Sequence, residues 1–312
     1  MSQTPDVIAV VVTYNRADKL VRVLEHVRAQ TTPPRQVIVV DNASTDGTPG
    51  ALAAAAVADP TLRVHRMATN TGGAGGFAEG MSLAHAAGAD LVWIMDDDCY
   101  PAPDALERLV EGRERAEKVL EEPVAFAGSM VLWRDGSLAV MNAPPASEDW
   151  GALLVRGVPA TLVEICSFVS VLVPRWAIER YGLPRREYFI WFDDAEYTHR
   201  ISAGGRGIQV HDSLVQHDLA ENTGVDVSTL DAATLWKFRY GMRNESSFLW
   251  HDMDAYRWLG FVLLTAVRLH RGQVPWRLRL AVGRAILAGL RFDPAVEHVD
   301  SPVAAPAPGT AR

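Results

Sequence analysis

The chain has 312 residues, of which 48% are hydrophobic and 22% charged, a composition typical of a globular protein with one large domain and an appendage. Its two cysteines, Cys99 and Cys166, lie far apart and have the spacing of neither a disulfide framework nor a zinc site, which suits a reducing compartment. The N-terminal residues lack the basic region and cleavage site of a signal peptide, and no apolar stretch reaches the roughly 18 to 20 residues of a membrane span. We therefore expect a cytoplasmic protein, soluble or peripheral.

The net charge of −8 at pH 7 is unevenly distributed. Residues 235–292 contain ten Lys and Arg against three Asp and Glu, which leaves −15 for the rest of the chain. An acidic main body argues against general nucleic-acid binding. The basic segment indicates an anionic partner instead, such as a membrane surface or a lipid diphosphate.

Strands and helices are predicted to alternate along the first hundred residues. Short apolar runs indicate strands, and helical spacing or alanine-rich composition indicates helices. Such alternation is typical of parallel strands joined by crossover helices, whose ligands bind beyond the carboxyl ends of the strands. The expected strands are residues 7–12, 36–40, 62–66 and 91–95, and the expected helices are residues 19–29, 49–58 and 75–87.

Three consecutive carboxylates, Asp96, Asp97 and Asp98, end the last of these strands. Alternation along an extended chain would direct Asp96 and Asp98 to one side and Asp97 to the other, so that two carboxylates converge on one hard divalent cation. A cation held in this way can neutralise a pyrophosphate, which points to a nucleotide leaving group. The alternative is a solvated acidic turn.

Polar clusters also follow the second and third expected strands. Asp41 comes directly after a buried strand, where its carboxylate can accept hydrogen bonds from a base or a ribose, whereas Ser44 and Thr45 are equally explained as turn or helix-capping residues. The glycine-rich residues 70–77 open a helix and can direct backbone amides at an anion, although a flexible loop is the default interpretation.

Four motifs, taken together and in order, resemble glycosyltransferase family 2, whose members have the GT-A fold. They are residues 10–16, 39–48, 70–77 and 96–98, within a resemblance that covers at least residues 6–220. The glycine run and residues 191–196 are most similar to the bacterial galactofuranosyltransferases and rhamnosyltransferases that build cell-wall glycans. The resemblance implies an α/β protein with a Rossmann-like, mostly parallel sheet flanked by helices and a C-terminal helical extension.

The resemblance also implies roles for single residues in binding the donor. Asp96 and Asp98 match the family's Asp-x-Asp motif, whose carboxylates meet the donor ribose, the sugar and Mn²⁺ or Mg²⁺. The residues that it assigns to the nucleoside and the donor are Thr13, Asn15, Asp41, Asn70, Gly73, Asp96 and Asp97.

A second acidic pair, Asp193 and Asp194, lies among aromatic residues at the expected start of a helix. Attack by a sugar hydroxyl needs a carboxylate that removes its proton, and an apolar wall raises the pKa of such a base, so either residue is a candidate general base. The alternative is helix capping by one of the two. The family pattern favours Asp194 as the base, with Asp193 beside the acceptor and Trp191 as a flat surface for a sugar.

A histidine completes the expected metal site. His217 follows two strand-like runs and matches a metal-binding histidine of similar galactofuranosyltransferases, and an imidazole joining two carboxylates around Mn²⁺ is ordinary chemistry. A lone surface histidine is the alternative, and His211 is the nearest rival for the role.

The last third of the chain lies outside these motifs. Residues 235–249 mix aromatic and basic side chains, which suits a lipid-linked acceptor. Arg277, Arg284 and Arg291 recur every seven residues opposite an apolar face, which indicates a basic amphipathic helix that lies on an anionic bilayer or packs on the catalytic domain or a second subunit. We expect a catalytic domain at 1–222, a helical region for the acceptor or the membrane at 223–296, and a disordered tail at 297–312.

The resemblance thus predicts a metal-dependent, inverting glycosyltransferase, peripheral on the inner face of the plasma membrane. The expected donor is UDP-galactofuranose, and the expected acceptor is a polyprenyl-diphosphate-linked or cell-wall saccharide. A rhamnosyltransferase that uses dTDP-rhamnose would carry the same motifs. A nucleotidyltransferase should have a basic, glycine-rich signature where this chain has Thr13, Tyr14 and Asn15, and a non-catalytic nucleotide-sugar sensor would not need Asp193 and Asp194.

Overall fold

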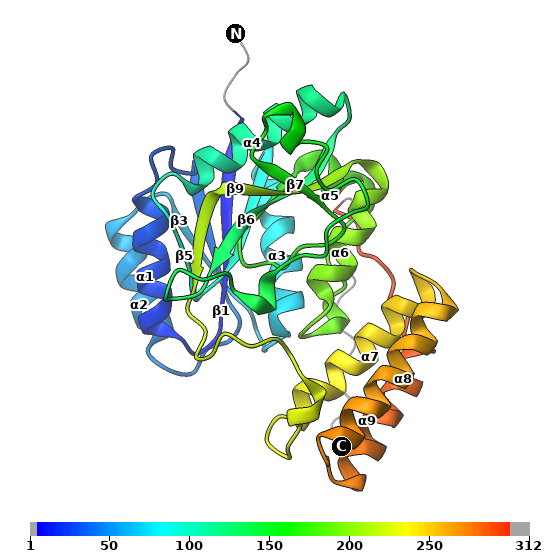
Figure 1. Ribbon diagram of the computed structural model, residues 1–312. Coiled ribbons are helices and arrows are strands. Elements are labelled where there is room, and N and C mark those ends of the chain that lie inside the picture. The colour runs from blue at the N-terminus through cyan, green and yellow to red at the C-terminus, as the bar shows by residue number, and fades with distance from the viewer. Residues whose placement is uncertain (1–4, 300–312) are drawn as a thin grey trace.

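A computed structural model describes residues 5–299 and consists of an α/β body from which three helices project (Figure 1). The described strands form one sheet in the order β3-β2-β1-β4-β8-β6-β9-β5, and β7 pairs with β9. The architecture is the expected α/β sheet flanked by helices.

The first half of the sheet is parallel, as predicted. Strand β1 pairs with β2 and β4, and β2 pairs with β3, each pair in parallel register. The alternation of strands and helices therefore brings the carboxyl ends of four strands to one edge. The elements are β1 (Val7–Thr13), α1 (Ala17–Arg28), β2 (Gln36–Asp41), α2 (Thr48–Ala58), β3 (Leu62–Arg66), α3 (Gly72–Ala86) and β4 (Leu91–Asp96).

The second half of the sheet is mixed. Strand β8 lies antiparallel between β4 and β6, and β9 runs parallel to β6 but antiparallel to β5 and β7. The runs 207–210 and 213–215 belong to the single strand β9. The elements are β5 (Cys99–Pro101), α4 (Ala105–Leu120), β6 (Val124–Leu132), β7 (Ala160–Val163), β8 (Val171–Pro174), α5 (Arg175–Tyr181), α6 (Asp193–Ile201) and β9 (Arg206–His217).

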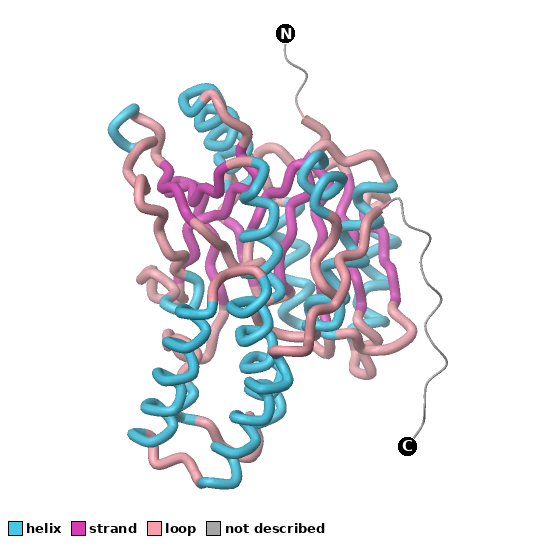
Figure 2. Tube along the Cα trace, turned by 90° about the vertical axis from the view of Figure 1, so that its right-hand side faces the viewer, coloured by secondary structure: helices cyan, strands magenta, loops and turns pink. Residues whose placement is uncertain are grey.

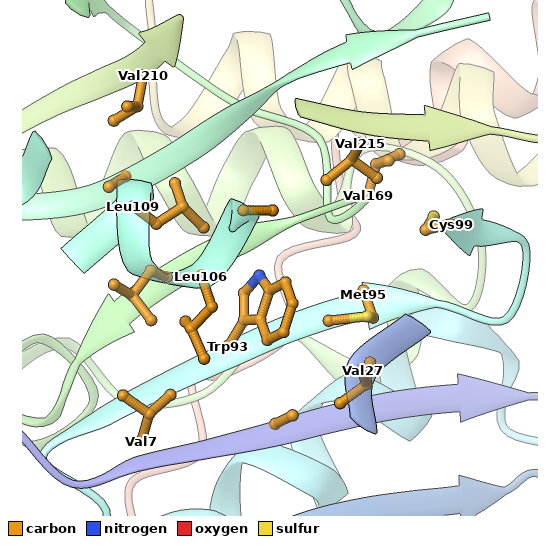
Figure 3. Packing of buried hydrophobic residues seen from close by; sticks show 14 of the residues in the cluster. Val7, Val27, Trp93, Met95, Cys99, Leu106, Leu109, Val169, Val210 and Val215 are labelled. Atoms are coloured by element: carbon orange, nitrogen blue, oxygen red, sulfur yellow. The ribbon is translucent and has the colours of Figure 1, made fainter. Parts of the chain in front are cut away.

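Hydrophobic cores cover both faces of the sheet. In β1, Val7, Ala9 and Val11 join the core beneath α1, α2 and α4, whereas the alternating residues join the core beneath α3, α5 and α6. Figure 3 shows the first of these cores around Trp93, whose indole nitrogen donates a hydrogen bond of 2.9 Å to the Ser170 hydroxyl. The period-2 pattern buries β1 on both sides and fixes its register.

Close packing of α3 explains part of the glycine run. A Cβ atom at Gly76 would lie 2.5 Å from Cγ1 of Val12, and one at Gly80 would lie 2.3 Å from Cγ1 of Val10. Real Cβ atoms do not approach other atoms so closely, so these glycines let the helix lie against β1. Gly72 has a φ of +73° at the start of α3, three residues before the predicted start of this helix.

Three C-terminal helices form a separate layer that extends beyond the sheet (Figure 2): α7 (Leu235–His251), α8 (Ala255–Arg271) and α9 (Trp276–Gly289). The apolar face of α9 is buried against α7, where a Cβ atom at Gly289 would lie 2.5 Å from the carbonyl oxygen of Arg243. The amphipathic face expected in this segment thus packs within the chain. No helix in residues 5–299 is both long and apolar enough to cross a membrane.

The predicted disordered tail at 297–312 begins too early. The carboxylate of Glu297 forms an ion pair with Nε of Arg186 at 2.6 Å. The carbonyl oxygen of Glu297 accepts a hydrogen bond of 2.8 Å from the amide of Leu183. These contacts fix residue 297 against the α/β body. Residues 300–312, the rest of the predicted tail, lie outside the described residues.

Candidate active site

A cavity of about 1590 Å³ lies between the carboxyl ends of β1 and β4, the start of α6 and the helices α7 and α8. This position, beyond the ends of parallel strands, is the one predicted from the sequence. Its volume exceeds that of a typical small-molecule site, which leaves room for two substrates. The predicted site residues that line it are Thr13, Asn70, Gly73, Asp96, Asp97, Asp98, Trp191, Asp193, Asp194 and His217.

The acidic triplet bends at its second residue. Strand β4 ends at Asp96, and a turn follows at Asp97 and Asp98, so the alternation of side chains expected for an extended chain does not hold. The Thr13 hydroxyl donates a hydrogen bond of 2.7 Å to Asp97, and the guanidinium of Arg16 bridges Asp97 and Asp98. Asp97 therefore ties β4 to the end of β1, while Arg16 balances part of the negative charge.

The pKa values of Asp96 and Asp98 are shifted in opposite directions by their surroundings. Burial and the charges of Asp98 and Asp97 raise the pKa of Asp96 well above its ordinary value. Burial acts in the same direction on Asp98, but the hydrogen bond and charge of His217, together with Arg16 and Lys19, hold the pKa of that carboxyl below its ordinary value. The ionised form of Asp96 is thus disfavoured by burial and by its acidic neighbours, and a nearby cation would favour it.

Residues suited to a metal ion gather beside this turn. Ligand atoms of Asp98, Cys99 and His217 lie within 4.8 Å of one another, and Nε2 of His217 is 3.3 Å from Oδ1 of Asp98. Cys99 is fully buried and does not line the cavity, whereas Asp98 and His217 do. Together with the neighbouring Asp96, which also lines the cavity, these two residues offer carboxylate oxygens and one imidazole, a donor set that fits Mn²⁺ or Mg²⁺.

A buried amide orients the histidine. Oδ1 of Asn142 lies 2.8 Å from Nδ1 of His217, and an amide oxygen can only accept a hydrogen bond. Nδ1 therefore donates to Asn142, and the other ring nitrogen, Nε2, faces Asp98 at the position from which it would bind a metal ion. The rival His211 bonds through Nε2 to the Thr161 hydroxyl at 2.6 Å, between β9 and β7, and does not line the cavity.

The second acidic pair begins helix α6. Its N-cap is Phe192, so neither carboxylate takes the capping position that the alternative interpretation required. Burial raises the pKa of Asp194 to about 6, although the backbone amide of Ala195 opposes the shift with a hydrogen bond of 2.8 Å. Burial and the charge of Asp194 raise the pKa of Asp193 well above its ordinary value. The pair thus includes a carboxylate whose pKa suits a base near neutral pH.

The loop before the pair is held in an unusual conformation. Phe189, Trp191 and Phe192 all have φ values between 65° and 68°, which side chains rarely adopt. The indole of Trp191 packs edge-on against Phe238 of α7, with ring centroids 5.3 Å apart. The Trp191 ring, which was predicted to pack against a sugar, thus contacts the helical region on one side. Trp191 also lines the cavity.

Two predicted nucleoside residues have other partners in the structure. Oδ1 of Asn15 accepts a hydrogen bond of 2.7 Å from the amide of Thr45. The Asp41 carboxylate accepts a hydrogen bond of 2.9 Å from the amide of Ser44 and forms an ion pair of 2.6 Å with Arg66. Neither residue lines the cavity, so in this structure both shape the loop that follows β2.

Several cavity residues were not predicted as site residues. Arg16 and Asn42 belong to the family motifs at 10–16 and 39–48, and Lys237, Tyr240 and Glu245 belong to the segment 235–249 that was expected to suit an acceptor. Asn142 and Arg268 had no signal in the sequence.

The fold is the GT-A architecture of glycosyltransferases. A solved structure of the mannosyltransferase PcManGT from Pyrobaculum calidifontis, in complex with GDP-Man and Mn²⁺, covers 93% of this chain and 76% of its own, at 22% identity and a TM-score of 0.54. A structure of GalNAc-T7 with UDP, GalNAc and Mn²⁺ covers 80% and 48%, at 14% identity and a TM-score of 0.58. At these identities the similarity establishes the fold.

Residues 8–148 match the family described as glycosyl transferase family 2, and this part of the chain belongs to that family. The galactofuranosyltransferase GlfT1 of Mycobacterium tuberculosis is 46% identical over 217 residues, 65% of this chain and 66% of that protein. The undecaprenyl-phosphate mannosyltransferase of Micrococcus luteus is 32% identical over 127 residues, 41% of this chain and 52% of that protein. The alignment with GlfT1 thus spans just under two thirds of that relative's length.

Proposed function

We propose that the chain transfers a sugar from a nucleoside diphosphate donor to a saccharide hydroxyl, with inversion at the anomeric carbon. The observation that carries the proposal is that one cavity is lined both by the candidate metal ligands Asp96, Asp98 and His217 and by the buried pair Asp193 and Asp194. The charge of Asp193 contributes to the raised pKa of Asp96, so the two groups are close enough to act on one substrate.

In this mechanism Asp194 removes the proton of the acceptor hydroxyl, whose oxygen forms a bond to the anomeric carbon as the bond from that carbon to the diphosphate breaks. A single displacement of this kind inverts the configuration. Asp96, Asp98 and His217 would hold Mn²⁺ or Mg²⁺, which supplies positive charge beside the departing diphosphate. Asp193 would contact the acceptor, and Trp191 would form a flat wall against its ring.

The donor we propose is UDP-galactofuranose. The identity of 46% to a galactofuranosyltransferase supports this choice over dTDP-rhamnose, which the same motifs would accommodate. Thr13, Asn70 and Gly73, which line the cavity, would bind the nucleoside end, and the roles of Asn15 and Asp41 in nucleoside binding stay predictions. A sensor without catalysis would not need the raised pKa of Asp194.

The acceptor we propose is a polyprenyl-diphosphate-linked or cell-wall saccharide, which the helical region at 223–296 would receive from a membrane surface. Helix α8 exposes apolar side chains beside basic ones, an arrangement that suits peripheral contact with anionic lipids. Tyr256 is 87% exposed and Leu263 59% exposed, and Arg257 and Arg271 are also exposed on this helix.

Calorimetry with Mn²⁺ present tests the donor first. UDP should bind more tightly than dTDP, and equal or reversed affinities would favour the rhamnosyltransferase. Incubation with UDP-galactofuranose and an octyl galactofuranosyl acceptor should then give a product heavier by one or more hexose residues in mass spectrometry. If nucleotide binds and no tested UDP-sugar is transferred, the sensor replaces the enzyme.

A further inference from the structure

One wall of the cavity comes from α7 and α8, outside the family's motifs. Lys237, Gly241 and Glu245 are spaced four residues apart along α7, so they share one face of the helix, and all three line the cavity. From α8, the lining residues include Phe261, Thr265 and Arg268. Side chains from two helices thus form a continuous surface at this end of the cavity.

This wall lies next to the loop that leads into the proposed catalytic pair, Asp193 and Asp194. A Cβ atom at Gly241 would lie 2.6 Å from Cε3 of Trp191, so α7 directly contacts the loop that leads into Asp193. The proposed nucleoside residues Thr13 and Asn70 come from other elements, the end of β1 and the segment before α3. A group bound to the wall of α7 and α8 would therefore approach from the side of the base.

Glu245 supplies the negative charge of this wall, and Lys237 and Arg268 supply the positive charge. The Glu245 side chain is partly buried, and within residues 5–299 no hydrogen bond or ion pair of its carboxylate is found. Burial raises the pKa of Glu245 to about 7, and the nearby charge of Arg268 lowers it only in part. A carboxyl group that lines a cavity and has no partner in the protein is available to accept a hydrogen bond from a ligand.

We infer that Glu245 and Arg268 recognise the acceptor saccharide: Glu245 accepts a hydrogen bond from a sugar hydroxyl that does not react, and Arg268, exposed at the mouth of the cavity, donates to an oxygen of the same acceptor. Glu245 is a binding and positioning residue here, since Asp194 removes the reacting proton. The inference rests on the proposed function and specifies which part of the site binds the acceptor.

The test compares Glu245→Gln with the wild type, using an octyl galactofuranosyl disaccharide as acceptor. The variant removes the charge and keeps the shape, so the KM for the acceptor should rise at least tenfold, while the Kd for UDP with Mn²⁺ and the rate of donor hydrolysis without acceptor stay within twofold. Arg268→Gln should change the same KM in the same direction. Glu114→Gln on α4 makes the same substitution at an exposed position and should change nothing.

Binding of the same disaccharide, measured by saturation-transfer NMR with UDP present, separates the possible failures. If the wild type transfers sugar and Glu245→Gln has an unchanged KM, or if donor binding falls as much as acceptor binding, the inference is wrong and the proposed function stands. If the wild type binds the disaccharide through Glu245 but transfers nothing, the proposed function is wrong and the inference stands. A wild-type protein that binds no acceptor overturns both.

Discussion

The side-chain amide of Asn244 in α7 donates a hydrogen bond of 2.9 Å to the backbone carbonyl of Trp191. The same nitrogen lies 2.8 Å from the carbonyl oxygen of Tyr188 and 3.1 Å from that of Ile190. Asn244 is fully buried, so its amide nitrogen has these carbonyls as partners in place of water. One amide of the helical region therefore fixes the strained loop that leads into the proposed catalytic pair.

Replacing Asn244 by Ala should loosen this loop. We expect kcat/KM for the acceptor to fall about tenfold to a hundredfold and stability to fall by about 1–3 kcal/mol, because buried carbonyls lose their donor. Donor binding should be unchanged. The matched control is Asn222→Ala, which removes an amide bonded to the carbonyl of Leu138 outside the cavity lining. Equal losses in the two variants would show that the bracing of the loop has no role in acceptor use.

Asp194→Asn should abolish the proposed base while leaving the shape of the site. Turnover should fall by about 10²–10⁴-fold, with the Kd for UDP and Mn²⁺ unchanged. Because the pKa of Asp194 in the folded state, about 6, exceeds the ordinary aspartate value of 3.8, ionisation of Asp194 costs stability as pH rises through about 6. The variant should therefore melt at a higher temperature than the wild type at pH 8 and at a similar one near pH 4. Retained turnover would move the base to another residue.

The wild-type enzyme should lose activity in acid. A base must be deprotonated to act, so kcat/KM for the acceptor should be level above pH 7 and fall towards tenfold per pH unit below about pH 6, where Asp194 gains a proton. Metal binding also weakens as ligands are protonated, so the affinity for Mn²⁺ and UDP is measured in the same buffers. An activity that stays level down to pH 4.5 would exclude Asp194 as the base.

Asn142→Leu tests the candidate metal site indirectly. Of the three candidate metal ligands, Asn142 hydrogen-bonds only to His217. Without the amide oxygen the imidazole can place its proton on either nitrogen, so the Kd for Mn²⁺, measured by electron paramagnetic resonance with UDP present, should rise about tenfold to a hundredfold. Thr161→Val, which removes the partner of His211, is the control and should leave the Kd unchanged. If both variants bind Mn²⁺ as the wild type does, His217 is not a metal ligand.

The parts predicted from the sequence are those with a local signal. The apolar runs of β1 and β4 and the turn residues after β2 determine the parallel half of the sheet, because burial on both faces leaves few other arrangements. Asp96 and Asp194 were proposed as site residues in the same way, since each belongs to a motif, and both line the cavity.

The remaining parts depend on contacts between distant segments. Asn142 and His217 lie 75 positions apart, and nothing in the local sequence around Asn142 indicates a histidine partner. The antiparallel strand β8 enters between β4 and β6 without a periodic pattern that would specify its place. Asn244 and Glu245 are ordinary polar residues of a helix until α7 packs against the loop at residues 188–192.

His217 stands directly opposite Cys99 in the antiparallel pairing of β5 with β9. The imidazole is thus positioned by backbone hydrogen bonding of the sheet. This candidate metal ligand would therefore keep its position in the absence of an ion. Domains that fold only around their metal must hold it permanently. In this protein the cation would be able to bind together with the nucleotide-sugar donor and to dissociate with the nucleoside diphosphate product. A chelator would then abolish activity without unfolding the protein.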